Sequence, residues 1–169
     1  KAKIPIRVGV NSGSVRGASS VDNMVKSARD YIKMLEGFDF YNIVVSLKAS
    51  NILDTVDAYR KISKLCNYPL HLGVTATGAP YSGAIKSSIA IGVLLLEGIG
   101  DTIRVSITGA AIKEVEIAKN ILSSLGLRNF GPEIISCPTC GRCEIDLTDT
   151  VEEFKRKLKE LKLDIEDLP

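Results

Sequence analysis

Five short apolar segments, each rich in Val and Ile, recur along the chain at intervals of about 30 residues. Continuous runs of β-branched and other apolar residues are typical of strands in parallel sheets. Each interval between the segments holds one helical pattern, so the chain is predicted to consist of βα repeats with a parallel sheet covered on both faces. The predicted strands span residues 4–10, 42–47, 70–74, 103–107 and 133–136.

Helix boundaries follow from capping residues and glycines. The first helix is predicted to begin after Ser19 or Ser20 and the second after Ser50 or Asn51, because hydroxyl and amide side chains favour N-caps. The last helix is predicted over residues 151–161, behind a capping box that opens at Thr150. The third helix is predicted to bury a stripe of Ile85, Ile89, Val93 and Leu96.

The repeat pattern alone does not distinguish a barrel from an open sheet. Eight βα units close a barrel, whereas an open doubly wound sheet can stop at about five strands. A dinucleotide-binding fold would carry G-x-G-x-x-G after its first strand, but Gly9, Gly13 and Gly17 stand four residues apart. The glycine spacing therefore argues against a Rossmann fold.

Composition excludes several classes of protein. The 169 residues are 45% hydrophobic and 25% charged, which excludes intrinsic disorder, and the net charge of +2 predicts neither a nucleic-acid nor a membrane partner. The longest apolar run, residues 89–96, is far shorter than the ~20 residues that span a bilayer. The first five residues contain neither Met nor an apolar leader, so we expect a cytoplasmic protein or a piece of a longer one.

Polar residues recur near the carboxyl ends of four predicted strands. In a parallel barrel these ends converge on one mouth, so the side chains are predicted to surround one anionic ligand. The alternative is that each charge is solvated separately at its own strand end. The residues are Arg7, Asn11, Lys48, Thr75, Arg104 and Ser106.

Two further features fit a phosphate ligand less specifically. The loop over residues 75–83 is rich in small residues and leads into a helix, where backbone N–H groups favour anions, and Lys86 follows one turn later. His71 is the only histidine, which excludes a zinc site with two imidazoles. A lone histidine in a strand is more often a hydrogen-bonded packing residue than a catalyst.

The cysteines give the sharpest chemical signal. Cys66 falls on the apolar stripe of the second predicted helix and is interpreted as a small buried hydrophobe. Cys137, Cys140 and Cys143 form C-x-x-C-x-x-C, a spacing compatible with an iron–sulfur cluster, half a zinc site or a redox disulfide. Clusters and tetrahedral zinc usually take four protein ligands, so the site is incomplete in this sequence.

Five segments in this order resemble the 4-hydroxy-3-methylbut-2-enyl diphosphate synthase family, iron–sulfur enzymes of isoprenoid biosynthesis. The resemblance runs from residue 1 to about residue 168, and its most specific parts are the fourth and fifth segments. The segments are IPIRVGVN at 4–11, VSLKAS at 45–50, HLGVT at 71–75, EGIGDTIRVS at 97–106 and SCPTCGR at 136–142.

The resemblance implies an α/β architecture, a (β/α)8 TIM-type barrel followed by a smaller iron–sulfur domain. By this comparison the chain is a C-terminal fragment of the enzyme. Residues 1–131 are expected to form the C-terminal half of the barrel, the family's last four βα units, and residues 132–169 the incomplete beginning of the cluster domain. Since a half-barrel exposes sheet edges and an uncovered interior, we expect the chain to self-associate, and the resemblance implies a homodimer.

The resemblance also implies a ligand set and a substrate site. Cys137 and Cys140 match two ligands of a [4Fe-4S] cluster, Cys143 matches a variable position, and the remaining ligands belong to a later segment that this chain lacks. The family usually has Thr-Glu-Ala-Gly where this chain has Ala76 in place of the acidic residue. The residues that match positions around the cyclic diphosphate are Arg7, Asn11, Lys48, His71, Thr75, Arg104 and Ser106.

The implied reaction is the reductive ring opening of 2-C-methyl-D-erythritol 2,4-cyclodiphosphate to 4-hydroxy-3-methylbut-2-enyl diphosphate. Two electrons come from ferredoxin or flavodoxin through the cluster, and cationic strand ends hold the phosphates. The fragment alone is not expected to turn over substrate. The competing hypothesis is an α/β module that binds a phosphorylated metabolite and uses its cysteines for zinc or redox sensing.

Overall fold

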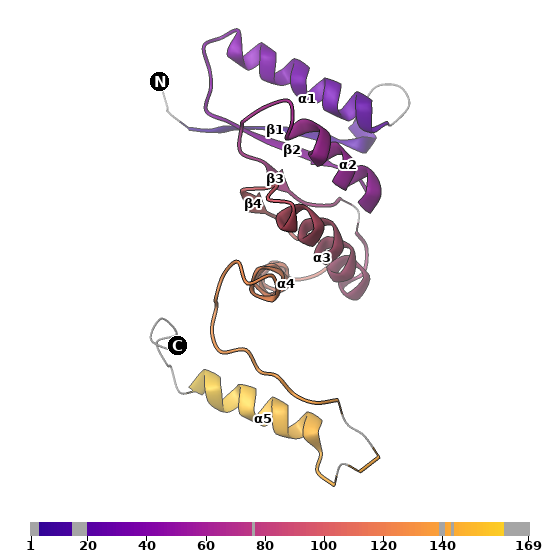
Figure 1. The fold of residues 1–169 in the computed structure, drawn as a ribbon, viewed down its shortest axis with the longest axis vertical. Coiled ribbons are helices and arrows are strands. Elements are labelled where there is room, and N and C mark those ends of the chain that lie inside the picture. Colours follow the sequence, from indigo (N-terminus) through magenta and orange to yellow (C-terminus); the bar gives the residue numbers. More distant parts are fainter. Residues whose placement is uncertain (1–3, 15–19, 76, 139–140, 143, 161–169) are drawn as a thin grey trace. The chain divides into compact units, whose positions relative to one another are not determined.

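Parallel strands and helices alternate along the first part of the chain in a computed structural model that describes residues 4–14, 20–75, 77–138, 141–142 and 144–160. The chain divides into two units, residues 1–127 and 128–169. Figure 1 shows the helices and strands of each unit. The first unit contains β1 (Ile6–Asn11), η1 (Ser12–Ser14), α1 (Val21–Glu36), β2 (Ile43–Lys48), α2 (Ile52–Ile62), β3 (His71–Leu72), α3 (Pro80–Leu96), β4 (Thr102–Ile103) and α4 (Ala111–Ser124).

The strands of the first unit pair in parallel and in chain order. β1 pairs with β2 over their full lengths, from Ile6 opposite Ile43 to Asn11 opposite Lys48. β3 pairs with β4, and a parallel bridge between Val45 and Leu70 joins the two pairs. This order, with a helix between successive strands, confirms the predicted βα repeats and is the arrangement of consecutive units in a barrel.

Helices cover one face of this sheet, and the prediction that both faces are covered is wrong for the described residues. Val8, Val10, Val45 and Leu47 point into one hydrophobic core with α1, α2 and α3. The residues between them on β1 and β2 are polar or glycine, so the opposite face has little apolar surface to bury against helices. We call it the open face. The core residues that the helices contribute include Met24, Ala28, Ile32, Val56, Tyr59, Ile62, Ile91 and Leu94.

Two of the predicted helix starts are confirmed in detail. Ser20 is the N-cap of α1, where its hydroxyl accepts a hydrogen bond from the N–H of Asn23 at 3.2 Å. Asn51 is the N-cap of α2 and accepts from the N–H of Leu53 at 2.8 Å. Each side chain satisfies a backbone donor that the helix itself leaves unpaired.

The predicted buried stripe on α3 is wrong except at Val93, which is half-buried against the core. Ile85, Ile89 and Leu96 are exposed, and the helix packs instead through a face of mostly smaller residues. α3 is apolar around nearly its whole circumference, so its periodicity does not indicate which face is buried. The buried face consists of Gly83, Ser87, Ala90, Ile91 and Leu94.

The second unit differs from the sequence prediction in two ways. Residues 133–136 form no strand, and no described segment pairs with them, although their composition favours a strand. The helix α5 spans Leu147–Glu160 and begins earlier than predicted, because Asp146 rather than Thr150 caps it, accepting from the N–H of Asp149 at 3.0 Å. None of the described helices is both long and apolar enough to cross a membrane.

We predict that Gly100→Ala destabilises the first unit by about 2–4 kcal/mol, measured by denaturant unfolding. Gly100 has a φ of +118°, and a Cβ there would lie 2.4 Å from Cδ1 of the buried Leu72. The control is Gly92→Ala in the interior of α3, where a Cβ meets no atom within 4 Å. Alanine favours a helix over glycine, so this variant is expected to be neutral or more stable by about 0.5–1 kcal/mol. Equal stability of the two variants would contradict the prediction.

Candidate functional site

Polar side chains from all four strands or the residues that follow them meet in one cavity on the open face. The cavity has a volume of about 370 Å³, and none of the described residues that line it is acidic. It brings together six of the seven residues for which the sequence predicts substrate contacts: Arg7, Asn11, Lys48, Thr75, Arg104 and Ser106. Gly9, Ser46 and Val74 complete the lining.

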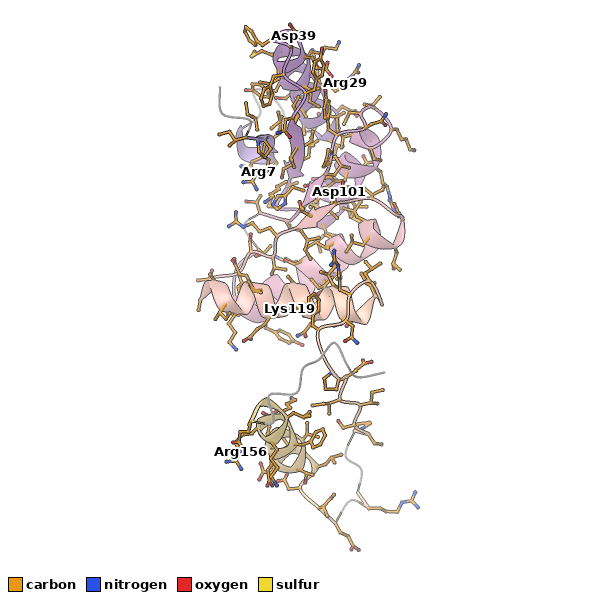
Figure 2. All side chains as sticks on the ribbon, turned by 90° about the vertical axis from the view of Figure 1, so that its left-hand side faces the viewer. Arg7, Arg29, Asp39, Asp101, Lys119 and Arg156 are labelled. Carbon is orange, nitrogen blue, oxygen red and sulfur yellow. The ribbon has the colours of Figure 1, made fainter. Side chains whose placement is uncertain are left out.

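The parallel register explains why these residues meet. Asn11 is directly opposite Lys48 in the β1–β2 ladder, and Gly9 is opposite Ser46 on the same face. Gly9 contributes no side chain, and a Cβ there would meet no atom within 4 Å, so the cavity extends above it. Figure 2 shows the side chains of this unit, with Arg7 labelled on β1.

Lys48 is the most deeply buried cation of the site, with 9% of its surface exposed. Burial, followed by the nearby charges of Arg104 and Arg7, lowers its pKa to about 8. No described carboxylate forms a salt bridge with Lys48. Among the described residues the ammonium group therefore has no counter-ion, in a cavity that also contains two guanidinium groups.

Gly73 makes room for the Lys48 side chain. A Cβ at Gly73 would lie 3.1 Å from Cε of Lys48 and 2.9 Å from the carbonyl oxygen of Arg104. Lys48 therefore lies directly against the backbone of β3 and the residues after it. No sequence pattern indicates this role of Gly73, because the contact joins residues that only the folded sheet brings together.

His71, the seventh predicted residue, does not line the cavity, but the cations of the cavity help to lower its pKa. Its Nδ1 atom lies 2.8 Å from the hydroxyl oxygen of Thr102, and its Nε2 atom is buried with no hydrogen-bond partner among the described residues. Burial, followed by the charges of Lys48, Arg7 and Arg104, lowers its pKa to about 4. The imidazole is therefore neutral at pH 7.

The loop between β3 and α3 is joined to the residues that follow β4. The buried hydroxyl of Thr77 donates a hydrogen bond to the carbonyl of Ser106, and the N–H of Thr108 donates to the carbonyl of Gly78 at 3.1 Å. These bonds hold Thr75 and Ser106 on the same rim. Lys86 is half-buried and does not line the cavity, and Ala76 lies outside the described residues.

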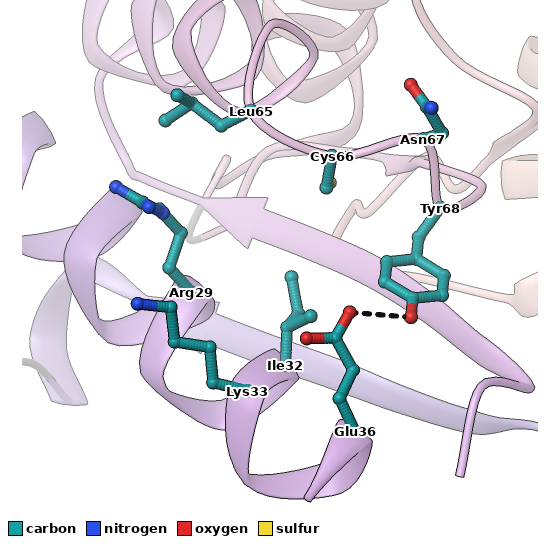
Figure 3. Close-up of a pocket in the computed structure, with 8 residues that line it drawn as sticks. All are labelled: Arg29, Ile32, Lys33, Glu36, Leu65, Cys66, Asn67 and Tyr68. Carbon is teal, nitrogen blue, oxygen red and sulfur yellow. Dashed lines mark hydrogen bonds between the residues drawn. The ribbon is translucent and has the colours of Figure 1, made fainter. Parts of the chain in front are cut away.

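A second cavity, of about 350 Å³, lies between α1 and the segment after α2 (Figure 3). Cys66 borders it as a half-buried free thiol, and burial raises the pKa of that thiol. The hydroxyl of Tyr68 donates to Oε1 of Glu36 at 2.8 Å. Cys66 also packs against the core, which confirms an apolar packing role, but it lies after the end of α2, so its predicted place on that helix is wrong.

Cys137 is the part of the predicted cluster site that the structure describes. It is a free, exposed thiol, so it fits a cluster ligand, whereas Cys140 and Cys143 lie outside the described residues. The described residues contain no group of three His, Cys, Asp or Glu side chains that could hold a metal ion. They supply one sulfur ligand and no complete site.

Comparison with known proteins identifies the first unit. The family model described as the GcpE TIM-barrel domain matches residues 1–119. Proteins named 4-hydroxy-3-methylbut-2-en-1-yl diphosphate synthase (flavodoxin) are similar over 95% or 96% of this chain and 48% of their own length. They come from Fusobacterium nucleatum (53% identity), Clostridium perfringens (49%) and Thermodesulfovibrio yellowstonii (51%).

These matches correct one expectation and establish another. The chain spans about half the length of these curated relatives, and most of it matches the barrel, which comes first in the family architecture implied by the resemblance. The chain thus belongs with the N-terminal barrel part of its relatives, and the prediction of a C-terminal fragment of the enzyme is wrong. The barrel-domain match and the parallel βα units together show that this chain belongs to the GcpE family.

Proposed function

We propose that this chain is part of an enzyme that opens the ring of 2-C-methyl-D-erythritol 2,4-cyclodiphosphate reductively, and that the open-face cavity binds the diphosphate. The supporting observation is the convergence of Arg7, Lys48 and Arg104 on a cavity whose lining, in the described part of the chain, contains no acidic residue. Two phosphates would supply the negative charge that balances these three cations. Charge-assisted hydrogen bonds in a partly buried site are strong. The competing hypothesis of a binding module is not favoured by the family match.

Each residue of the cavity has a proposed role toward this substrate. Lys48 and the two arginines neutralise the phosphates, and arginine can pair with phosphate oxygens through two parallel hydrogen bonds. Asn11, Thr75 and Ser106 are the donors we assign to the remaining phosphate or hydroxyl oxygens. His71 stays neutral behind them and contributes packing and one hydrogen-bonding nitrogen.

The iron–sulfur chemistry is proposed to come from residues that follow the barrel units. Residues 1–131 would be βα units of the barrel, and residues 132–169 would begin the iron–sulfur domain. We assign Cys137 and Cys140 as two ligands of a [4Fe-4S] cluster, which would supply electrons to the bound substrate. With this incomplete ligand set, the chain by itself is not expected to turn over substrate.

The partners follow from the same assignment. The names of the relatives specify flavodoxin, so we propose flavodoxin rather than ferredoxin as electron donor. Iron–sulfur chemistry with free thiols fits a reducing compartment, and we propose a cytoplasmic location and a homodimer.

The test of the whole proposal is conversion of the cyclic diphosphate by the full-length protein, reconstituted without oxygen and supplied with reduced flavodoxin. An iron-loaded protein that leaves the substrate unchanged would contradict it.

We predict that Lys48→Ala and Arg104→Ala each weaken the binding of inorganic pyrophosphate to the chain about 10- to 100-fold. Each change removes one charge-assisted hydrogen-bonding group, worth about 1.5–3 kcal/mol. Titration calorimetry measures the affinity. The matched control is Lys33→Ala, which removes an exposed cation of α1 that borders the second cavity instead.

In the full-length protein, the same two variants are expected to bind substrate more weakly while their iron content stays unchanged. Wild-type pyrophosphate affinity in both variants, or a parallel loss of iron, would show that these side chains are not ligand contacts.

Pyrophosphate affinity is also predicted to fall as the pH rises through about 8. The pKa of Lys48 in the free protein is about 8, so its ammonium charge is fully present below that pH and is lost above it. The decline should approach tenfold per pH unit well above the pKa. In Lys48→Arg the decline should disappear, because a guanidinium stays charged throughout this range. An identical pH profile for the two proteins would contradict the assignment of Lys48.

A further inference from the structure

β2 and β3 are joined by the parallel bridge between Val45 and Leu70, and a side chain from α2 occupies the next position at which their backbones could pair. Direct backbone bonds lie on both sides of this position: the N–H of Val45 donates to Pro69 at 2.8 Å, and the N–H of Thr75 donates to Ala49 at 3.1 Å. In a regular parallel ladder the N–H of Leu47 would donate directly to the carbonyl of His71.

The hydroxyl of Tyr59 lies between the two backbone groups. It accepts from the N–H of Leu47 at 3.2 Å and donates to the carbonyl of His71 at 2.5 Å. Both groups are therefore satisfied through the phenol rather than by each other.

Tyr59 is well suited to hold this position. It is fully buried, and burial raises the pKa of its phenol to about 12, so the hydroxyl keeps its proton at neutral pH. α2 begins directly after the loop that follows β2, which places the ring behind the sheet. A second hydroxyl of α2, that of Thr55, accepts from the N–H of Ala49 at 3.2 Å and fixes the same strand end.

The position of the Tyr59 hydroxyl coincides with the course of the Lys48 side chain. Leu47 immediately precedes Lys48, and Lys48 lies over Gly73, two residues after His71. A Cβ at Gly73 would approach Cε of Lys48 to 3.1 Å, so no spare room exists between this side chain and β3. A direct hydrogen bond from the N–H of Leu47 to the carbonyl of His71 would bring β2 and β3 closer together. They would then be closer at the point where the Lys48 side chain passes from β2 across Gly73.

We propose that Tyr59 is a positioning residue for phosphate binding: its hydroxyl spaces β2 from β3, and this spacing lets the Lys48 side chain lie across Gly73 into the open-face cavity. This inference rests on the proposed function, because Lys48 matters only where an anion binds. Tyr59 touches no substrate. It acts through the backbone of the two strands that carry Lys48 and Gly73.

The test is Tyr59→Phe in the full chain, with two readouts. Phenylalanine keeps the ring and leaves Leu47 and His71 to pair directly, so Lys48 is expected to move outward into solvent. The first readout is the ¹³Cε chemical shift of Lys48 against pH without any ligand. The titration midpoint should rise from about 8 by at least one pH unit, because the ammonium group is then surrounded by water and feels less of the positive charge of Arg7 and Arg104.

The second readout is the affinity for inorganic pyrophosphate at pH 7, which should fall about 5- to 20-fold. Tyr68→Phe is the matched control, since it removes a tyrosine hydroxyl bound to Glu36 at the other cavity. It is expected to leave both the midpoint and the affinity unchanged. A folded Tyr59→Phe protein with the wild-type Lys48 midpoint would overturn the proposal.

One measurement on the wild-type chain keeps the proposal falsifiable if Tyr59→Phe does not fold. A through-hydrogen-bond NMR coupling between the nitrogen of Leu47 and the carbonyl carbon of His71 should be absent, because the hydroxyl separates them. Its presence would overturn the proposal. The ligand-free readouts also separate the two claims: if wild-type protein binds no pyrophosphate, the proposed function fails while the role of Tyr59 is still decided by the Lys48 titration.

Discussion

The alternation of side chains along parallel strands is the constraint on which the rest of the structure depends. One set of residues, such as Val8 and Val45, points into the helical layer and builds the core. The other set, including Arg7 and Lys48, points to the open face. Because the two sets are interleaved residue by residue, the packing that fixes the register of the strands also places the cations.

This arrangement has an electrostatic consequence. Lys48 is buried beside two arginines without a described carboxylate partner, and burial and repulsion both disfavour its charge. An anion that enters the cavity replaces lost hydration and relieves this repulsion. The unfavourable environment of the Lys48 charge in the free protein therefore supports the proposed binding of a doubly phosphorylated ligand. Neutral His71 fits the same environment, since a further positive charge there would be unfavourable.

Local patterns in the sequence predicted the parts of the fold that depend on local chemistry. Apolar runs indicated the first four strands, and Ser20 and Asn51 marked two helix starts. The buried face of α3 was not predictable from its sequence, because isoleucines and leucines surround that helix and tertiary packing selected the side with Gly83 and Ala90. Residues 133–136 have strand-forming composition, but a strand exists only where another segment offers hydrogen bonds.

The candidate site was likewise predictable from the sequence only in part. Its polar strand-end residues were predictable because a parallel sheet gathers such ends. The supporting contacts were not, since the fit of Lys48 over Gly73 and the hydroxyl of Tyr59 between two strands depend on residues far apart in sequence. No sequence motif indicates that the hydroxyl of a tyrosine on α2 takes the place of a backbone hydrogen bond between two strands.

The most direct test of the central claim is a crystal structure of the full-length protein with the cyclic diphosphate bound. We expect phosphate oxygens within hydrogen-bonding distance of Nζ of Lys48 and of the Arg104 guanidinium, on the open face of the sheet. Phosphates bound elsewhere, for example at Arg29 and Lys33 in the second cavity, with the open-face cations left in water, would contradict it.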